Sequence, residues 1–372
     1  MSSLSEEMYE FFTEDEIWFD ESDKVANELL QEKQEKMQIE DKELIDWIEW
    51  DLWININNAP IKLKELHEEL PKNNWRRKTA ILIDWTNFLF RYYYWIWPMY
   101  DSQLFWAENI NWIYWMLNKI LWHIKNRVDY LYVCWEGWKL TRKQIFSEYK
   151  TNRDDVPKNI RFQCDVLHNI LKKLHIPSVF YSWYEADDTI ATLARKIDER
   201  ENWNVNIYIH STDKDFNQLL KHNIYLFKPN KKSVYSVEDF QQEFWFDIKY
   251  FIDYLSLIWD TSDNIPWLKW IWKVWAKKII QEYWTIENLY KNAKDAIQKK
   301  LIWKKSVQEF ITKECAQKLM LNKKLIEFLE VPNVEIFELH QLWWTYSNYK
   351  KIIVDELNFW NFALTIEDIF HY

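Results

Sequence analysis

Residues 183–188 read Trp-Tyr-Glu-Ala-Asp-Asp and lie between an apolar run at 176–181 and a helical pattern. Glu185, Asp187 and Asp188 fall in the first turn of the helix that this pattern predicts. Carboxylates are favoured there by the helix dipole, so a capped helix start explains them when they are taken alone. The apolar stripe that identifies the helix is Ile190, Leu193, Ala194 and Ile197.

The same event, an apolar and β-rich run that ends in acidic residues, occurs three more times. Helical patterns separate the runs, which favours right-handed βαβ units and a parallel sheet. The ends of parallel strands form the crevice in which such folds bind ligands. Carboxylates gathered there repel one another, and hard divalent cations such as Mg²⁺ compensate them. The further runs are Thr79–Ile83 before Asp84, Tyr130–Cys134 before Glu136, and Val205–His210 before Asp213 and Asp215.

Length and composition restrict the class of protein. A chain of 372 residues holds one large domain or two small ones. Its three cysteines are too widely spaced for a disulfide framework or a zinc signature. No apolar stretch approaches the ~20 residues that span a bilayer, and the acidic N-terminus does not resemble a signal peptide. We therefore expect a cytoplasmic protein.

The composition contains one anomaly, 1 glycine and 27 tryptophans. Average glycine usage predicts about 26 glycines in a chain of this length. Many tryptophans stand in turns, where glycine is the default. Our hypothesis is that most are UGA codons that the source organism reads as glycine; the alternative is a protein that is truly rich in tryptophan. The suspected glycine positions are Trp85, Trp183, Trp259, Trp267, Trp270, Trp272 and Trp275.

Charge divides the chain into regions. Residues 1–50 carry 17 acidic and 4 basic side chains, a balance of −13, so residues 51–372 carry a net charge of +3 within the total of −10. We interpret 1–75 as a mobile acidic extension, either a solvating tail or an arm that binds a protein partner. The folded part is predicted to comprise an α/β core at 76–235 with a β-hairpin at 224–235, a helical region at 236–330, and a segment of unknown role at 331–372.

Two stretches have the character of nucleic-acid contacts. In Thr141–Arg161 basic residues alternate with Phe146 and Tyr149, a pattern that suits a nucleic-acid backbone and a stacked base, although a solvated helix face is the alternative. In Ser256–Ile280, glycine in place of tryptophan turns the loop into a helix–hairpin–helix pattern whose backbone amides approach a DNA phosphate.

Five segments, in this order, resemble the 5′-nuclease family of flap endonucleases and 5′→3′ exonucleases. They are ILIDWTN (81–87), SEYKTNR (147–153), WYEADD (183–188), STDKD (211–215) and WDTSDNIPWLKWIWKVWAKK (259–278). The resemblance implies an α/β fold with a parallel central sheet flanked by helices, like that of PIN domains. It also implies a helical arch near 139–161 and a helix–three-turn–helix that holds duplex DNA, often with a K⁺ ion.

Residue by residue, the resemblance implies a site for two Mg²⁺ ions, for which Mn²⁺ is a substitute. Its metal-binding set is Asp84, Glu185, Asp187, Asp188, Asp213, Asp215, Asp260 and Asp263. Glu136 joins this set although the family usually has Asp there. Lys150 and Arg153 match the basic pair that steers the scissile phosphate. The expected DNA contacts are Arg91, Arg142, Lys269, Lys273 and Lys277.

The function that follows is a structure-specific 5′ nuclease acting on DNA with a free 5′ end or a 5′ flap. It would remove primers or flaps in replication and repair, leaving a 5′-phosphate and a 3′-hydroxyl. No polymerase motif follows, which suggests a stand-alone enzyme. The alternative from another class is a non-catalytic DNA-structure binder on the same fold. A small RNA-cleaving domain of similar topology is a weaker alternative, because it has no need of the 260–280 loop.

Overall fold

The computed structural model describes residues 77–85, 111–137, 140–152, 158–228, 233–258, 263–264, 271–302, 307–310, 312–341 and 345–370. The acidic extension lies outside the described residues. So do Arg91, Arg153, Asp260, Lys269, and the tryptophans at 259, 267 and 270.

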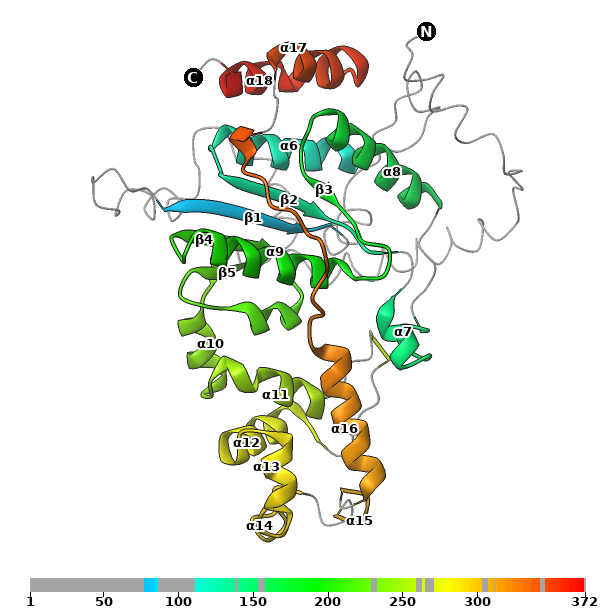
Figure 1. Ribbon diagram of the computed structural model, residues 1–372, viewed down its shortest axis with the longest axis vertical. Coiled ribbons are helices and arrows are strands. Elements are labelled where there is room, and N and C mark those ends of the chain that lie inside the picture. Colours follow the sequence, from blue (N-terminus) through cyan, green and yellow to red (C-terminus); the bar gives the residue numbers. More distant parts are fainter. Residues whose placement is uncertain are drawn as a thin grey trace, which may run out of the picture.

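A six-stranded sheet forms the centre of the fold, in the order β3-β2-β1-β4-β5-β6 (Figure 1). Its strands are β1 (Lys78–Asp84), β2 (Tyr130–Cys134), β3 (Ser178–Val179), β4 (Val205–His210), β5 (Ile224–Lys228) and β6 (Ser233–Tyr235). The first five strands run parallel, and β6 returns antiparallel to β5. The predicted parallel sheet and the hairpin at 224–235 are thus both confirmed.

The central strand β1 is buried on both faces, as the apolar run at 80–83 within KTAILID favours. Ile81 and Ile83 point into one core, together with helices α6 (Asn111–Lys125) and α8 (Lys158–Lys173). Ala80 and Leu82 point into the other, with helix α9 (Ala186–Arg200). Figure 1 shows α6 and α8 on one side of the sheet and α9 on the other.

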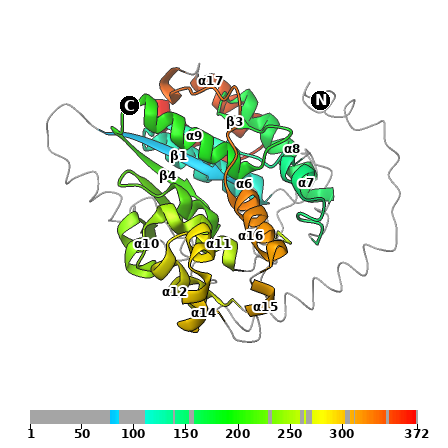
Figure 2. The ribbon, with the colours of Figure 1, turned by 60° about the horizontal axis from the view of Figure 1, so that its bottom comes forward.

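The second core continues into a helical region at the far end of the molecule. This region lies opposite α17 and α18 in both ribbon views (Figures 1 and 2). After α16 the chain returns along α9 towards the sheet (Figure 1). The helices of this region are α10 (Val237–Phe244), α11 (Phe251–Leu257), α12 (Lys273–Tyr283), α13 (Ile286–Lys291), α14 (Ala293–Gln298), α15 (Val307–Phe310) and α16 (Lys313–Ile326). The short turn η1 (Lys214–Leu219) precedes this region, and the turn η3 (Ile248–Tyr250) lies within it, between α10 and α11.

The C-terminal segment, for which the sequence predicts no role, completes the first core. Tyr349, Ile353, Phe362 and Ile366 are buried in the same cluster as the apolar face of α6. Its elements are η5 (Leu339–Gln341), α17 (Tyr346–Tyr349), η6 (Lys350–Glu356), η7 (Trp360–Phe362) and α18 (Ala363–Phe370). Within the described part of the chain, no helix is long and apolar enough to cross a membrane.

Among the residues that the structure describes, three tryptophans have a backbone conformation that favours glycine. Trp203, Trp245 and Trp284 have φ of 63°, 62° and 67° and follow the ends of α9, α10 and α12. None of them is among the positions suspected from sequence. Trp85, in contrast, does not have the positive φ that we expect from its place after a strand, because it begins a helical turn. It is buried against Trp135, with the ring centroids 4.6 Å apart.

Candidate active site

Parallel register brings the acidic residues to one edge of the sheet. Asp84, the last residue of β1, lies beside Cys134 of β2, and Ile83 lies beside His210 of β4. The residues that follow these strands therefore leave the sheet at the same edge. Helix α9 begins at the same edge, directly after Glu185.

A serine that the sequence analysis did not single out links two of the predicted metal ligands. The buried Ser211 hydroxyl donates to Asp84 Oδ2 at 2.7 Å and accepts from the Asp213 amide at 3.0 Å. Asp213 Oδ1 in turn accepts from the Asp215 amide at 2.9 Å, which caps the turn η1. One hydroxyl thus fixes the end of β1 relative to the turn after β4.

Asp187 lies in the middle of this negative charge. Burial raises its pKa well above the ordinary value, and the charges of Asp84 and Asp213 raise it further. Glu185 adds to the same effect, while the Lys150 ammonium opposes it. Carboxylates from β1, from α9 and from the turn after β4 therefore interact strongly at this edge.

The only glycine in the chain holds the loop after β2 against the loop before α9. The Gly137 amide donates to the Tyr184 carbonyl at 3.0 Å. A Cβ at this position would come within 2.3 Å of the Tyr181 carbonyl oxygen and 2.4 Å of that of Tyr184. This close approach brings Glu136 Oε2 to 3.4 Å from the Ala186 amide, at the start of α9.

The turn at 148–151 places Lys150 among the carboxylates. Its ammonium forms ion pairs with Glu185 and with Glu136, the latter at 3.6 Å. Burial alone would lower the pKa of Lys150, but the charges of Glu136 and Glu185 outweigh it and raise the pKa. The Lys150 backbone has φ of 54°, and its amide donates to the Asp263 carbonyl at 3.0 Å.

Tyr149 does not present a ring to a base, as the sequence pattern suggests. The side chain is only 2% exposed, and its hydroxyl lies 3.0 Å from Glu185 Oε2 and 3.2 Å from Asp263 Oδ2. Since it bridges two of the predicted ligands, its place is inside the site. Phe146 is partly buried and packs against the core.

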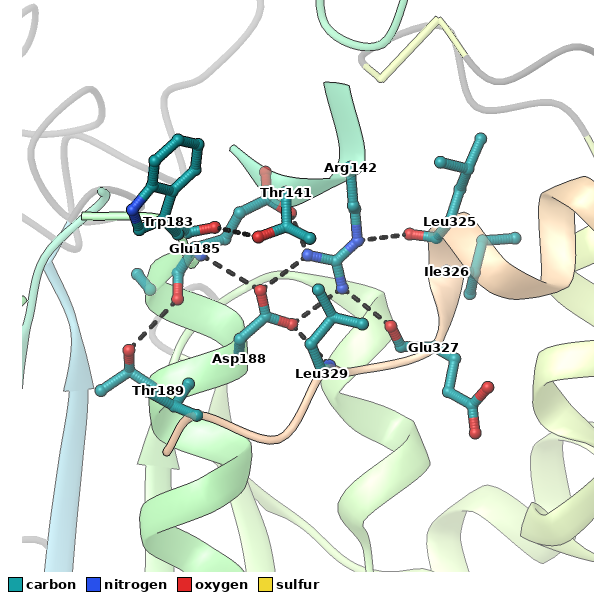
Figure 3. A network of polar contacts seen from close by, with 12 residues as sticks. Thr141, Arg142, Trp183, Glu185, Asp188, Thr189, Leu325, Ile326, Glu327 and Leu329 are labelled. Carbon is teal, nitrogen blue, oxygen red and sulfur yellow. Dashed lines mark hydrogen bonds and ion pairs between the residues drawn. The ribbon is translucent and has the colours of Figure 1, made fainter. Parts of the chain in front are cut away.

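Arg142 and Asp188 also differ from their predicted roles. Arg142, an expected DNA contact, is 2% exposed and pairs with Glu185 and Asp188 (Figure 3). Burial alone would lower the pKa of Arg142, but the hydrogen bonds to Asp188 and the charges of both carboxylates raise it. Asp188 is fully buried and also caps α9 by accepting from the Glu185 amide at 3.1 Å. The capping interpretation of the acidic triplet therefore holds for Asp188.

The other predicted DNA contacts lie on α12 or outside the described residues. Lys273 is exposed at the start of α12, beside Trp272 and Trp275, which are 66% and 40% exposed. Lys277 instead donates to the Glu243 carbonyl, at the end of α10. Trp183 is 46% exposed in the loop before α9, and its carbonyl accepts from Thr141.

The carboxylates lie at one edge but do not form a complete metal-binding site in the described residues. In the described ranges, no three His, Cys, Asp or Glu side chains are arranged to hold one ion. Two of the carboxylates already have protein partners, because Lys150 pairs with Glu185 and Arg142 pairs with Asp188. The donor set itself suits a hard divalent cation, since all donors are carboxylates, and burial together with their mutual repulsion raises the pKa of Asp187.

Comparison with known proteins places this site in a family. Residues 79–245 match the family model of the 5′-3′ exonuclease N-terminal resolvase-like domain. A 5′-3′ exonuclease of Aquifex aeolicus is 30% identical over 263 residues, which cover 70% of this chain and 85% of that protein. The DNA polymerase I of Caldicellulosiruptor bescii is 31% identical over 261 residues, 66% of this chain but 30% of that protein.

Solved structures show the same fold. The T5 D15 protein co-crystallised with metal ions has a TM-score of 0.54 at 19% identity, covering 78% of this chain and 99% of that one. The catalytic core of Rad2 in complex with DNA substrate has a TM-score of 0.53 at 16% identity, covering 79% and 92%.

The mostly parallel sheet is the fold of these structures, and the relatives place the chain in the class of 5′ nucleases. The chain belongs to the 5′-3′ exonuclease family, whose members are phosphodiester hydrolases. The predicted resemblance and the predicted fold class are both confirmed.

Proposed function

We propose that the chain is a structure-specific 5′ nuclease that hydrolyses DNA at a free 5′ end or a 5′ flap, in replication and repair. The observation that supports this most is the gathering of carboxylates at the sheet edge, where Ser211 links Asp84 to the Asp213 turn and Lys150 pairs with Glu136 and Glu185. A protein that only binds DNA gains nothing from buried carboxylates that repel one another. This cost is why we favour the nuclease over the non-catalytic binder.

In this proposal the carboxylates at the edge hold two Mg²⁺ ions, or Mn²⁺ in their place. The ions supply Lewis-acid charge for attack by water and for departure of the 3′-oxygen, leaving a 5′-phosphate and a 3′-hydroxyl. We leave Asp188 out of the set because Arg142 engages both of its oxygens. The proposed holders are Asp84, Glu136, Glu185, Asp187, Asp213, Asp215 and Asp263, together with Asp260.

The chain's own cations orient the DNA. The Lys150 ammonium lies among the carboxylates, where it can pair with a phosphate oxygen and offset charge that develops on it. Arg153 is proposed to assist it. Arg91, Lys269 and Lys273 are proposed to contact the phosphate backbone, and the 260–280 loop to bind duplex DNA, with K⁺ as a further ligand of that loop.

The test is cleavage of a labelled 5′-flap duplex in Mg²⁺, with binding of the same duplex measured in Ca²⁺. Asp187→Asn should lower kcat by at least about a hundredfold and leave binding intact, because phosphate contacts come from Lys and Arg. Asp355→Asn, an exposed carboxylate on η6, is the matched control and should change neither. A wild-type protein that binds the flap tightly but cleaves nothing in Mg²⁺ or Mn²⁺ would establish the non-catalytic binder instead.

A further inference from the structure

Arg142 is saturated with protein partners. Its guanidinium has five N–H groups, and the structure gives five acceptors. Nε donates to the Leu325 carbonyl at 2.7 Å, and one terminal nitrogen donates to Glu185 Oε2 and Asp188 Oδ2, both at 2.7 Å. The other terminal nitrogen donates to Asp188 Oδ1 and to the Glu327 carbonyl, both at 2.8 Å. Figure 3 shows this arrangement. No donor is left for a phosphate.

Asp188 is saturated in the same way. A carboxylate offers about four acceptor positions, two on each oxygen. Oδ1 accepts from Arg142 and from the Leu329 amide at 2.8 Å, and Oδ2 accepts from Arg142 and from the Glu185 amide at 3.1 Å (Figure 3). No lone pair is left for a metal ion.

The two residues join three parts of the chain that are far apart in sequence. Arg142 belongs to the short helix α7 (Thr141–Ile145), and Asp188 lies in the first turn of α9. Their backbone partners at 325–329 form the segment that leaves α16. The same segment is tied down on both sides, by Gln218 to the Ile326 carbonyl at 3.1 Å and by the Val331 amide to Thr192 at 3.0 Å.

Glu185 receives its orientation from this junction. Its Oε2 faces the Arg142 guanidinium and the Tyr149 hydroxyl, while its Oε1 faces Lys150. Oε2 of Glu185 is therefore held by buried groups, and Oε1 points to Lys150 at the acidic edge of the sheet.

We propose that Arg142 and Asp188 are positioning residues, which together fix Glu185 and lock the segment 325–329, and with it the helical region, to the nuclease core. The proposal rests on the proposed function in taking Glu185 as a residue that holds metal. It assigns Arg142 no contact with DNA and Asp188 no contact with metal.

The test compares Arg142→Met, Asp188→Leu and the double variant. Removal of one member leaves a buried charge unpaired, whereas apolar replacement of both removes that penalty. Each single variant should therefore lower the midpoint of urea unfolding, and the double variant should recover a large part of the loss. In flap cleavage the double variant should still lose at least about tenfold in kcat with KM unchanged, because Glu185 has lost its fixed partner.

The chain supplies a matched control pair. Arg195 and Glu330 join the same helix to the same returning segment at the surface, with 3.3 Å between nitrogen and oxygen. Arg195→Met with Glu330→Leu removes an exposed ion pair between the same two segments, and this pair does not touch Glu185. This control should keep the wild-type midpoint and the wild-type kcat.

Two further measurements exclude the rival roles. If Arg142 contacted a phosphate, the double variant would reduce the salt slope of duplex binding in Ca²⁺ by about one unit. If Asp188 were a ligand, a Mn²⁺ titration followed by electron paramagnetic resonance would show one bound ion fewer. We expect an unchanged slope, and the same number of ions bound with about tenfold lower affinity. Either rival result, or a double variant with full kcat, overturns the proposal.

Failure of the proposed function would look different. A wild-type chain that binds no Mn²⁺ and cleaves no flap rejects the nuclease proposal, while the unfolding data still test the junction. Strictly additive midpoint losses in the double variant would show that the two residues are not coupled. If the double variant does not fold, Arg142→Lys takes its place. Lysine keeps the charge but lacks the fork geometry, so a full kcat in this variant also overturns the proposal.

Discussion

Replacement of Trp245 by glycine should stabilise the protein. Trp245 ends α10 with φ of 62° and ψ of 26°, and its amide donates to the Gln241 carbonyl at 2.9 Å. A side chain with a Cβ pays about 1–2 kcal/mol in this left-handed conformation, which glycine adopts freely. Burial of the indole adds little to the stability, because the residue is 76% exposed.

The net effect follows from two opposing contributions. Glycine relieves the left-handed strain but gains about 0.5–1 kcal/mol of backbone entropy in the unfolded chain. We therefore expect Trp245→Gly to raise the free energy of unfolding by about 0.5–1 kcal/mol, a shift of about 1–2 °C in Tm. Differential scanning calorimetry of the purified chain measures this shift directly.

Trp360 is the matched control, because it is 64% exposed and does not have a positive φ. Trp360→Gly carries the entropy cost without relief of strain, and it loses a surface hydrogen bond to Asn358. It should lower the free energy of unfolding by about 0.5–1 kcal/mol. The two variants should thus differ by about 1–2 kcal/mol. Equal losses of Tm in both would refute the reasoning, and with it the structural support for glycine at position 245.

Three further predictions concern the acidic edge. Gly137→Ala should lower the free energy of unfolding by about 1–3 kcal/mol and reduce kcat, because the added Cβ meets two carbonyl oxygens. The control Ser182→Ala, in the neighbouring exposed loop, should change neither quantity, and equal Tm and kcat in the two variants would contradict the clash. Ser211→Ala should weaken Mg²⁺ binding about tenfold in calorimetry, because Asp84 loses a 2.7 Å donor, and unchanged affinity would show that the hydroxyl does not orient that carboxylate. Mg²⁺ affinity should rise with pH, because burial and the neighbouring negative charges raise the pKa of Asp187 and make a proton compete with the ion. The metal-free chain should lose stability as pH rises through that pKa, and an affinity that does not change with pH would argue against the crowding.

The strands were predictable because their signal is local. Unbroken apolar runs bounded by acidic residues gave β1, β2 and β4 to within a residue, and the acidic ends gave the edge of the sheet. The run at 176–181 forms only the two-residue strand β3, because it pairs on one side alone, with Val133 and Cys134.

The rest depends on contacts that no local pattern contains. The basic sequence around Arg142 indicates a surface cation. Only the folded chain brings Leu325, 183 residues away, to the Arg142 guanidinium. Tyr149 reads as a stacking aromatic because its neighbours are basic, but its hydroxyl finds two carboxylates instead. Ser211 is an ordinary residue after a strand until its register places it beside Asp84.

One expectation within the glycine hypothesis is wrong. Trp85 follows a strand, where we expected a positive φ, and it does not have one. The three described tryptophans that do have a positive φ follow the ends of α9, α10 and α12, where glycine commonly ends a helix. Trp284 is the most unusual of them, since its φ of 67° and ψ of −54°, with the Thr285 amide 2.8 Å from the Tyr283 carbonyl, form a γ-turn.

The two ends of the sheet have a consequence for solubility. An exposed strand edge is a template on which a second chain can add a strand, and long apolar edges promote aggregation. Here the outermost strands are the shortest, Ser178–Val179 with two residues and Ser233–Tyr235 with three, while β1, with its apolar run at 80–83, lies in the interior. The sheet that the structure describes thus offers a neighbouring molecule only five residues of edge strand with which to pair.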